Sequence, residues 1–369
     1  MNEDFLNKKL QERIAGNALR SLKINKAAGN NTTIDFCSND YLGIVKNKLI
    51  ENEISPALSH GSTGSRLLSG NYDLIEETEK FIADFHDAEA GIIFNSGYDA
   101  NTGLLSAVPQ KNDVIIYDQL SHASLRDGIR LSFATAFSFL HNDLNDLEKK
   151  LSSLGQGAQK FVVTESVFSM DGDFAPLEEI IRLCEGYNAV LIVDEAHATG
   201  VIGDKGEGLV QKLNLQKKCF ARVHTFGKAC GTHGAIVLGS EKLKQYLINF
   251  SRQFIYSTAL PPASVAAIGS SYQLFPEMKE ERNHINTLIH IFKESNPKFK
   301  ILPSDTPIQI VIIPGNEEVK KIAGTLQANN FDIRPILYPT VPKGQERLRV
   351  VMHAFNSVEE VNVLTKLLL

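Results

Sequence analysis

Between about residue 40 and residue 270, short apolar runs alternate with longer segments whose apolar residues recur at helical spacing. The short runs predict strands, and their nearly continuous apolar character indicates burial on both faces of a sheet. The predicted strands are 91–94, 113–117, 161–164, 190–193, 221–224 and 235–238, and the predicted helices are 73–87, 99–108, 143–153 and 176–187. This order predicts an α/β fold in which helices cover both faces of a mostly parallel sheet.

The two ends of the chain have a different pattern. Residues 4–24 predict an amphipathic helix, because apolar residues recur there at near-helical spacing among charged ones. After about residue 272, the pattern predicts a polar helix at 276–296, a strand at 306–313, a helix at 317–329 and a strand at 347–352. We therefore predict three parts, namely an N-terminal helical arm (1–39), a large domain (40–272) and a small C-terminal α+β domain (273–369).

Composition narrows the class of protein. The formal net charge is -5, which gives no basic footprint for a nucleic acid partner. No apolar run approaches the roughly 18 residues that a membrane helix requires, and the first residues lack the apolar stretch of a secretory signal. The four cysteines are scattered without metal-ligand or redox spacing. We therefore expect a cytoplasmic protein with reduced thiols, no metal site and no membrane or nucleic acid partner.

A lysine and an aspartate follow two of the predicted strands. Asp194 comes directly after the apolar run 190–193, and Lys228 lies among the small residues beyond 221–224. Pyridoxal phosphate needs a lysine amine for its Schiff base and a carboxylate that keeps its ring nitrogen protonated, so that the ring accepts electrons from a carbanion. The pair therefore indicates a pyridoxal phosphate site at the carboxyl ends of the strands.

Other strand ends carry residues that fit the same cofactor. Gly97 and Tyr98 open the helix after strand 91–94, where free N–H groups favour a phosphate, although this segment taken alone favours an ordinary capped helix start. His122, after strand 113–117, can stack on a planar ring. Ser169 can donate to a ring oxygen, within what also reads as a Met-Asp-Gly turn.

His197 is the last residue of Asp194-Glu195-Ala196-His197 and can face the same site as Asp194. There it would orient the carboxylate or bond the ring hydroxyl. The same four letters also name a helicase box. That alternative fails, because the chain contains no G-x-x-x-x-G-K-[ST] phosphate loop.

These segments together resemble the α-oxoamine synthase family of fold-type I pyridoxal phosphate enzymes. The resemblance runs from Asn39-Asp40-Tyr41-Leu42-Gly43 to Arg347-Leu348-Arg349, and its most specific segments are Ser121–Ser124, Val167–Asp173, Asp194–Gly200 and Thr225–Lys228. It implies the fold of a fold-type I pyridoxal phosphate transferase. It also implies a decarboxylative condensation of an amino acid with an acyl thioester, in a homodimer.

The resemblance also implies a role for each matching residue. Lys228 would form the Schiff base, Asp194 would hold the ring nitrogen, and His122 would stack on the ring. His197 and Ser169 would bond the ring hydroxyl, while Thr225 and the backbone of Gly97 and Tyr98 would hold the phosphate, with Thr258 reaching it from the second subunit. Arg349 would grip the amino-acid carboxylate, and Arg20 and Asn39 would lie at the substrates.

Within the family, Gly61–Gly70 looks most like the enzymes that join L-alanine to a pimeloyl thioester in biotin synthesis. Soluble serine palmitoyltransferases and 2-amino-3-ketobutyrate ligases remain open. An aminotransferase of the same fold is a more distant alternative, against which the four specific segments argue, and a binding protein with a decayed site is disfavoured because every expected polar group is present. The sequence departs from the family pattern at two places near the expected substrate sites. These departures weaken the prediction of the substrate rather than that of the cofactor. The stretch Arg334–Pro342 is longer than usual, and Cys230 and His233 replace the expected residues after the lysine.

Overall fold

The computed structural model describes residues 3–22, 33–155, 157–295 and 298–368. It divides into two compact units, which we call the large unit (Leu42–Ser169 and Phe174–Arg282) and the small unit (Met1–Tyr41, Met170–Asp173 and Asn283–Leu369). The three parts predicted above divide the chain in sequence order, whereas these units group segments by their contacts in space. The N-terminal segment thus falls in the same unit as the C-terminal residues.

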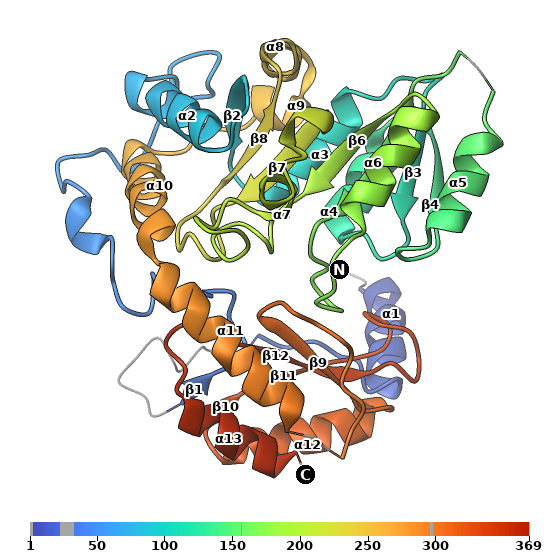
Figure 1. Cartoon of the computed structure of the whole chain (residues 1–369), viewed down its shortest axis with the longest axis vertical. Coiled ribbons are helices and arrows are strands. Elements are labelled where there is room, and N and C mark those ends of the chain that lie inside the picture. The colour runs from blue at the N-terminus through green and yellow to red at the C-terminus, as the bar shows by residue number, and fades with distance from the viewer. Residues whose placement is uncertain (1–2, 23–32, 156, 296–297, 369) are drawn as a thin grey trace. The chain divides into compact units, whose positions relative to one another are not determined.

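The large unit is built on a seven-stranded sheet with the order β2-β8-β7-β6-β5-β3-β4. The strands are β2 (Ala90–Phe94), β3 (Val114–Asp118), β4 (Thr135–Phe139), β5 (Lys160–Glu165), β6 (Ala189–Asp194), β7 (Ala221–Thr225) and β8 (Ala235–Gly239). Every neighbouring pair is parallel except β2–β8 and β7–β8. The predicted mostly parallel α/β sheet is therefore confirmed (Figure 1).

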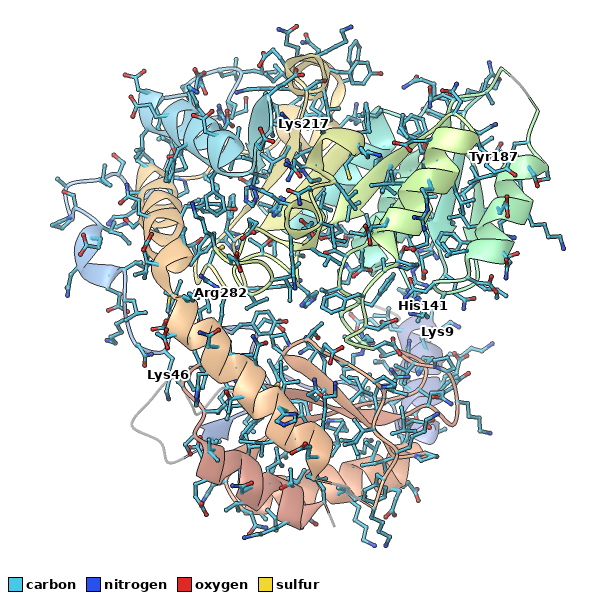
Figure 2. All side chains as sticks on the ribbon, in the orientation of Figure 1. Lys9, Lys46, His141, Tyr187, Lys217 and Arg282 are labelled. Atoms are coloured by element: carbon cyan, nitrogen blue, oxygen red, sulfur yellow. The ribbon has the colours of Figure 1, made fainter. Side chains whose placement is uncertain are left out.

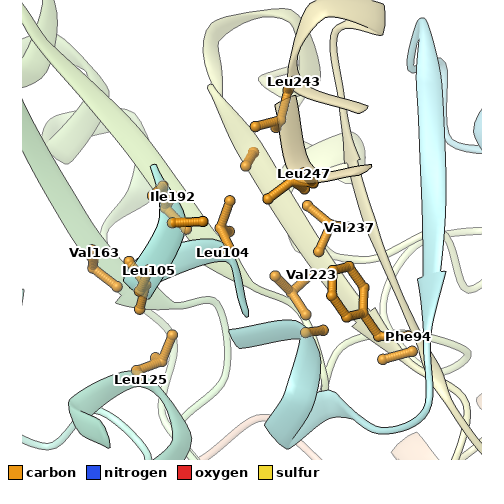
Figure 3. Close-up of a cluster of buried hydrophobic side chains, with 14 of the residues drawn as sticks. Phe94, Leu104, Leu105, Leu125, Val163, Ile192, Val223, Val237, Leu243 and Leu247 are labelled. Carbon is orange, nitrogen blue, oxygen red and sulfur yellow. The ribbon is translucent and has the colours of Figure 1, made fainter. Parts of the chain in front are cut away.

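Helices cover both faces of this sheet. They are α2 (Asp73–Phe85), α3 (Gly97–Ala107), α4 (Ala123–Leu131), α5 (Leu144–Ser152), α6 (Leu177–Gly186), α7 (Leu209–Lys212), α8 (Glu241–Phe250), α9 (Arg252–Ile255) and α10 (Pro262–Leu274), with 3-10 turns η2 (Glu51–Glu53), η3 (Gln216–Lys218) and η4 (Phe275–Glu277). On one face, Leu104 of α3 and Leu247 of α8 pack with Val223 of β7 in a buried apolar cluster (Figure 3). Helices α5 and α6 lie on the other side of the sheet (Figure 1).

The last helix to begin in the large unit, α11 (Lys279–Glu294), is anchored there by Arg282, which is labelled in Figure 2. Its guanidinium donates to the main-chain oxygens of Phe275 at 2.6 Å, Asp204 at 2.7 Å and Pro276 at 2.9 Å. The predicted helix at 276–296 corresponds to α11, and residue 296 lies outside the described residues.

The small unit contains a three-stranded antiparallel sheet with the order β11-β12-β9 and a parallel pair of two short strands. Its elements are α1 (Asp4–Ala15), β1 (Ile34–Asp35), β9 (Ile308–Ile312), α12 (Asn316–Ala328), β10 (Phe331–Asp332), β11 (Arg334–Ile336), β12 (Arg347–Val351) and α13 (Val358–Leu367). Strand β1 pairs with β10, almost 300 positions later in the sequence. The predicted α+β character of the C-terminal segment is present.

One predicted element differs from the structure, and one strand was missed. Helix α1 ends at Ala15, because Gly16 is its C-cap and Asn17 takes a left-handed φ of 52°, so residues 16–22 are not helical; residues 23 and 24 lie outside the described residues. Strand β4 was not predicted, because it lies at the edge of the sheet and its first four residues are exposed, which removes the continuous apolar run. Across the described residues, no helix is long and apolar enough to cross a membrane.

Candidate active site at the strand ends of the large sheet

Asp194 is the last residue of β6 and is almost fully buried. Both oxygens of its carboxylate accept hydrogen bonds. Oδ1 accepts from the backbone N–H of Ala196 at 2.8 Å, and Oδ2 accepts from the side-chain amide of Asn101, on α3, at 2.7 Å. Two N–H donors, one on each oxygen, fix the orientation of the carboxylate. The side chain of Asp194 is therefore held in one orientation at the end of the sheet.

Lys228 lies in the tight connection between β7 and β8. The backbone N–H of Phe226 donates to the oxygen of Gly234 at 2.9 Å, and the N–H of Gly231 donates to that of Lys228 itself at 2.8 Å. The turn needs the left-handed φ of 62° that Gly231 adopts without strain. The amine of Lys228 lies 2.8 Å from Nε2 of His197. Lys228 and His197, which follow different strands in the sequence, are thus in contact.

The start of α3 has the geometry of a phosphate cradle. Ser96 caps the helix, accepting the N–H of Asp99 at 3.0 Å, and Gly97 is its first residue. A Cβ added at Gly97 would lie 3.3 Å from Oγ1 of Thr225, closer than an ordinary contact, so the absence of a side chain keeps this corner open. The Tyr98 hydroxyl donates a hydrogen bond to Oδ2 of Asp127 at 2.5 Å. Backbone N–H groups at a helix start, beside a threonine hydroxyl, suit an anion.

His122 is the N-cap of α4, where its Nδ1 accepts the N–H of Ser124 at 3.2 Å and lies 2.8 Å from the Ser124 hydroxyl. The Asn101 amide donates to that hydroxyl at 3.0 Å as well as to Asp194. One chain of hydrogen bonds therefore links His122 to Asp194. The pKa of His122 is lowered, first because the site removes water from its ring, while the nearby charge of Asp194 opposes the shift.

The other two cofactor residues predicted in the large unit lie in loops. A bridge between Val167 and Phe174 closes the loop that contains Ser169. Thr258 is exposed, and its main-chain oxygen accepts from the Asn95 amide at 2.9 Å. The roles assigned to both residues stay predictions.

The three predicted substrate residues belong to the small unit. Arg349, on β12, is largely buried and donates to Oδ1 of Asn39 at 3.0 Å, so these two are in contact. Arg20 is exposed and donates to the hydroxyl of Thr340 at 3.0 Å. Arg20 and Thr340 help line a cavity of about 190 Å³ in this unit, whose wall also includes Pro335–Pro339. The longer stretch noted in the sequence therefore forms part of a cavity wall.

Three residues of the site were not assigned from the sequence. Asn101 and Ser124 lie inside segments that the sequence singled out, four residues after Gly97 and two after His122, but nothing in their spacing showed that they bridge two segments. Glu165 ends β5, pairs in register with Asp194 and accepts the backbone N–H of His122 at 2.5 Å. Its signal was a carboxylate directly after a strand, the same signal that identified Asp194.

The residues of the large unit fit pyridoxal phosphate. Lys228 supplies the amine, Asp194 the oriented carboxylate, and the start of α3 with Thr225 the phosphate cradle. The cofactor, when bound, supplies a protonated ring that withdraws electrons from a substrate carbanion. These groups follow the carboxyl ends of β2, β6 and β7, the edge of such sheets where ligands bind.

The family model described as aminotransferase class I and II matches residues 31–368. Over 97% of this chain and 94% of the relative, the sequence is 39% identical to a putative 8-amino-7-oxononanoate synthase from Bacillus licheniformis. It is 40% identical to the 8-amino-7-oxononanoate synthase of Emericella nidulans, over 90% of this chain and 87% of that protein.

Solved structures agree with these relatives. A lysine-to-alanine variant of serine palmitoyltransferase from S. paucimobilis, solved with an aldimine of pyridoxal phosphate and myriocin bound, superposes with a TM-score of 0.88 and 26% identity, over 99% of this chain and 96% of its own. The 8-amino-7-oxononanoate synthase of Francisella tularensis superposes with a TM-score of 0.76 and 28% identity, over 91% and 97% of the two chains. Similarity thus extends over nearly the whole chain in both comparisons.

Proposed function

Because the chain belongs to the α-oxoamine synthases, acyltransferases that use pyridoxal phosphate within the aminotransferase class I and II family, we propose a specific reaction for it. It joins L-alanine to a pimeloyl thioester to give 8-amino-7-oxononanoate, the free thiol and carbon dioxide, in biotin synthesis. The observation that carries this proposal is the identity of about 40% to proteins named for that product, over nine-tenths of the chain. The Gly61–Gly70 segment supports the same substrate pair.

In this proposal each residue of the site in the large unit has a separate role. The carboxylate of Asp194, oriented by two N–H donors, would bind the ring nitrogen. The amine of Lys228 would accept or give a proton at Nζ, and His197, 2.8 Å away, would orient it. His122, fixed as the cap of α4, would contact the ring. The start of α3 with Thr225, joined by Thr258 of a second chain, would hold the phosphate.

A panel of substrates tests the proposal. Thiol release should be fastest with L-alanine and a pimeloyl thioester, carried by coenzyme A or by acyl carrier protein, and slower with glycine or serine and with palmitoyl thioester. Preference for serine with palmitoyl thioester would replace the biotin reaction by that of a serine palmitoyltransferase. Amino transfer without thiol release would instead indicate an aminotransferase.

Arg349→Lys should lose rate as well as affinity for the amino acid. The planar guanidinium can bind a carboxylate through two parallel hydrogen bonds, whereas an ammonium offers only a point charge. Loss of that geometry misorients the scissile bond, so we expect kcat to fall about 10- to 100-fold while KM for alanine also rises. Steady-state kinetics with alanine varied would measure both. A changed KM with wild-type kcat would contradict the geometric role.

We also propose that the working unit is a cytoplasmic homodimer. The segment 257–260 is tied to the loop 61–70, since the Ser62 hydroxyl donates to the oxygen of Ala259 at 2.6 Å. Around it Leu68 and Tyr256 are 85% and 72% exposed, apolar surface of the kind that subunit interfaces bury. A two-fold dimer would cover this surface on both chains at once.

Mixing two inactive variants tests whether Thr258 is shared. If Thr258 acts in the partner's site, a dimer of one Lys228→Ala chain and one Thr258→Ala chain contains one intact site. Random reassembly should then restore up to about a quarter of the wild-type activity, since half of the dimers are mixed and half of their sites are intact. No recovery on mixing, with mixed dimers shown by mass, would place Thr258 in its own subunit's site.

A further inference from the structure

Glu165 is an almost fully buried carboxyl group that the reaction described above does not use. It is the last residue of β5, and its Cα pairs with that of Asp194 on the neighbouring parallel strand β6. Residues paired in register on parallel strands point to the same face of a sheet, so the two carboxyl groups are neighbours. Oε1 of Glu165 accepts the backbone N–H of His122 at 2.5 Å.

Two buried carboxyl groups side by side do not both ionise readily, because burial and the like charge each penalise the second negative charge. Asp194 has the better support for that charge, with N–H donors on both oxygens, whereas one N–H donates to Glu165. Burial, then the charge of Asp194, raises the pKa of Glu165 well above its usual value. Asp118 raises it further, while the N–H of His122 and the charge of Lys228 lower it.

We propose that Glu165 is a positioning residue of the cofactor site that remains a neutral carboxylic acid. Its Oε1 fixes the N–H of His122, and therefore the start of α4 and the histidine that faces the cofactor. Its proton, on Oε2, leaves Asp194 as the charged member of the pair, so that the negative charge is concentrated on the oxygen atoms that are oriented by Asn101 and Ala196. This inference rests on the cofactor role proposed for Asp194 and not on the choice of amino acid or acyl chain.

Infrared difference spectroscopy of the complete enzyme tests the protonation state directly. At neutral pH the wild type should show a carboxylic acid C=O band that is absent in Glu165→Gln. Glu79 provides a matched control, since it is equally buried but paired with Arg66 at 2.6 Å and Lys244 at 3.0 Å. Glu79→Gln should remove no such band. Identical C=O bands in the wild type and Glu165→Gln would overturn the proposal.

The coupling to Asp194 gives a second readout that a purely structural role would not move. In Asp194→Asn the neighbouring charge is gone, so the Glu165 band should disappear at a lower pH than in the wild type. A band whose pH midpoint does not move in Asp194→Asn would overturn the proposal. Both measurements need no substrate, so a failed acyl transfer assay would leave them unaffected.

The positioning role is tested by cofactor affinity. Glutamine keeps an oxygen for the N–H of His122 without a charge, so Glu165→Gln should bind pyridoxal phosphate within about threefold of the wild type. Alanine leaves that N–H buried without its acceptor, and Glu165→Ala should bind the cofactor about 10- to 100-fold more weakly. Unfolding midpoints of both variants show whether each is folded. Equal weakening in the two folded variants would overturn the proposal.

Discussion

Lys228→Ala should bind pyridoxal phosphate without a link that borohydride can reduce, and acyl transfer should fall by about a million-fold or to the background of the assay. In the proposed mechanism this amine forms the covalent link, and an alanine offers nothing in its place. The same proposal makes it the proton carrier, with His197 as its neighbour at 2.8 Å. Mass spectrometry after borohydride treatment measures the link, and thiol release measures the reaction.

Lys217 is the matched control for this experiment. It is a lysine of the same unit, labelled in Figure 2, and its side chain is 78% exposed. Lys217→Ala should keep both the reducible link and the reaction. A reducible link that survives in Lys228→Ala and maps to another lysine would disprove the assignment of the cofactor lysine.

Asp194→Asn should lower kcat by about three to five powers of ten, each equivalent to about 1.4 kcal/mol of transition-state stabilisation. An amide keeps the shape of the carboxylate but cannot favour a protonated ring nitrogen, so the ring becomes a weaker electron acceptor. Asparagine has one oxygen, so only one of the two donors, the Asn101 amide or the N–H of Ala196, keeps its acceptor, and the unfolding midpoint shows whether the variant is folded. Steady-state thiol release and the cofactor's absorption spectrum measure the two effects.

Asp194→Glu provides the corresponding control, because it keeps the charge and displaces it. If charge is what matters, Asp194→Glu should retain more activity than Asp194→Asn. If position is what matters, both should be equally weak. Near-wild-type turnover in Asp194→Asn would contradict the role of this carboxylate as the partner of the ring nitrogen.

Much of this fold could be predicted from the sequence, because strands of a parallel sheet that are buried on both faces consist of apolar runs. All six predicted strands of the large sheet are present, and the missing one, β4, is the edge strand that burial does not constrain. The end of α1 was missed for a similar reason. Its apolar residues are exposed, so burial does not require the helix to continue as far as the apolar pattern does.

The site was predictable where a residue type alone carries chemistry, as Lys228 and Asp194 do. It was not predictable where chemistry depends on register. The pairing of Glu165 with Asp194 follows from the alignment of β5 with β6, and the link from Asn101 through Ser124 to His122 follows from the packing of α3 on α4. These contacts join residues about 20 to 30 positions apart, and no pattern among neighbouring residues in the sequence indicates them.

The small unit is assembled from three separate stretches of the chain. This limits where the protein can be truncated or recombined with a relative. A fragment that begins at residue 283 would lack β1, the partner of β10, and Asp171, which pairs with Arg347 at 2.8 Å. It would also lack Asn39, the partner of Arg349. Truncation and domain exchange at a single junction would therefore expose unpaired backbone and buried charge. Recombination with a relative needs at least the N-terminal and C-terminal segments to be inherited together.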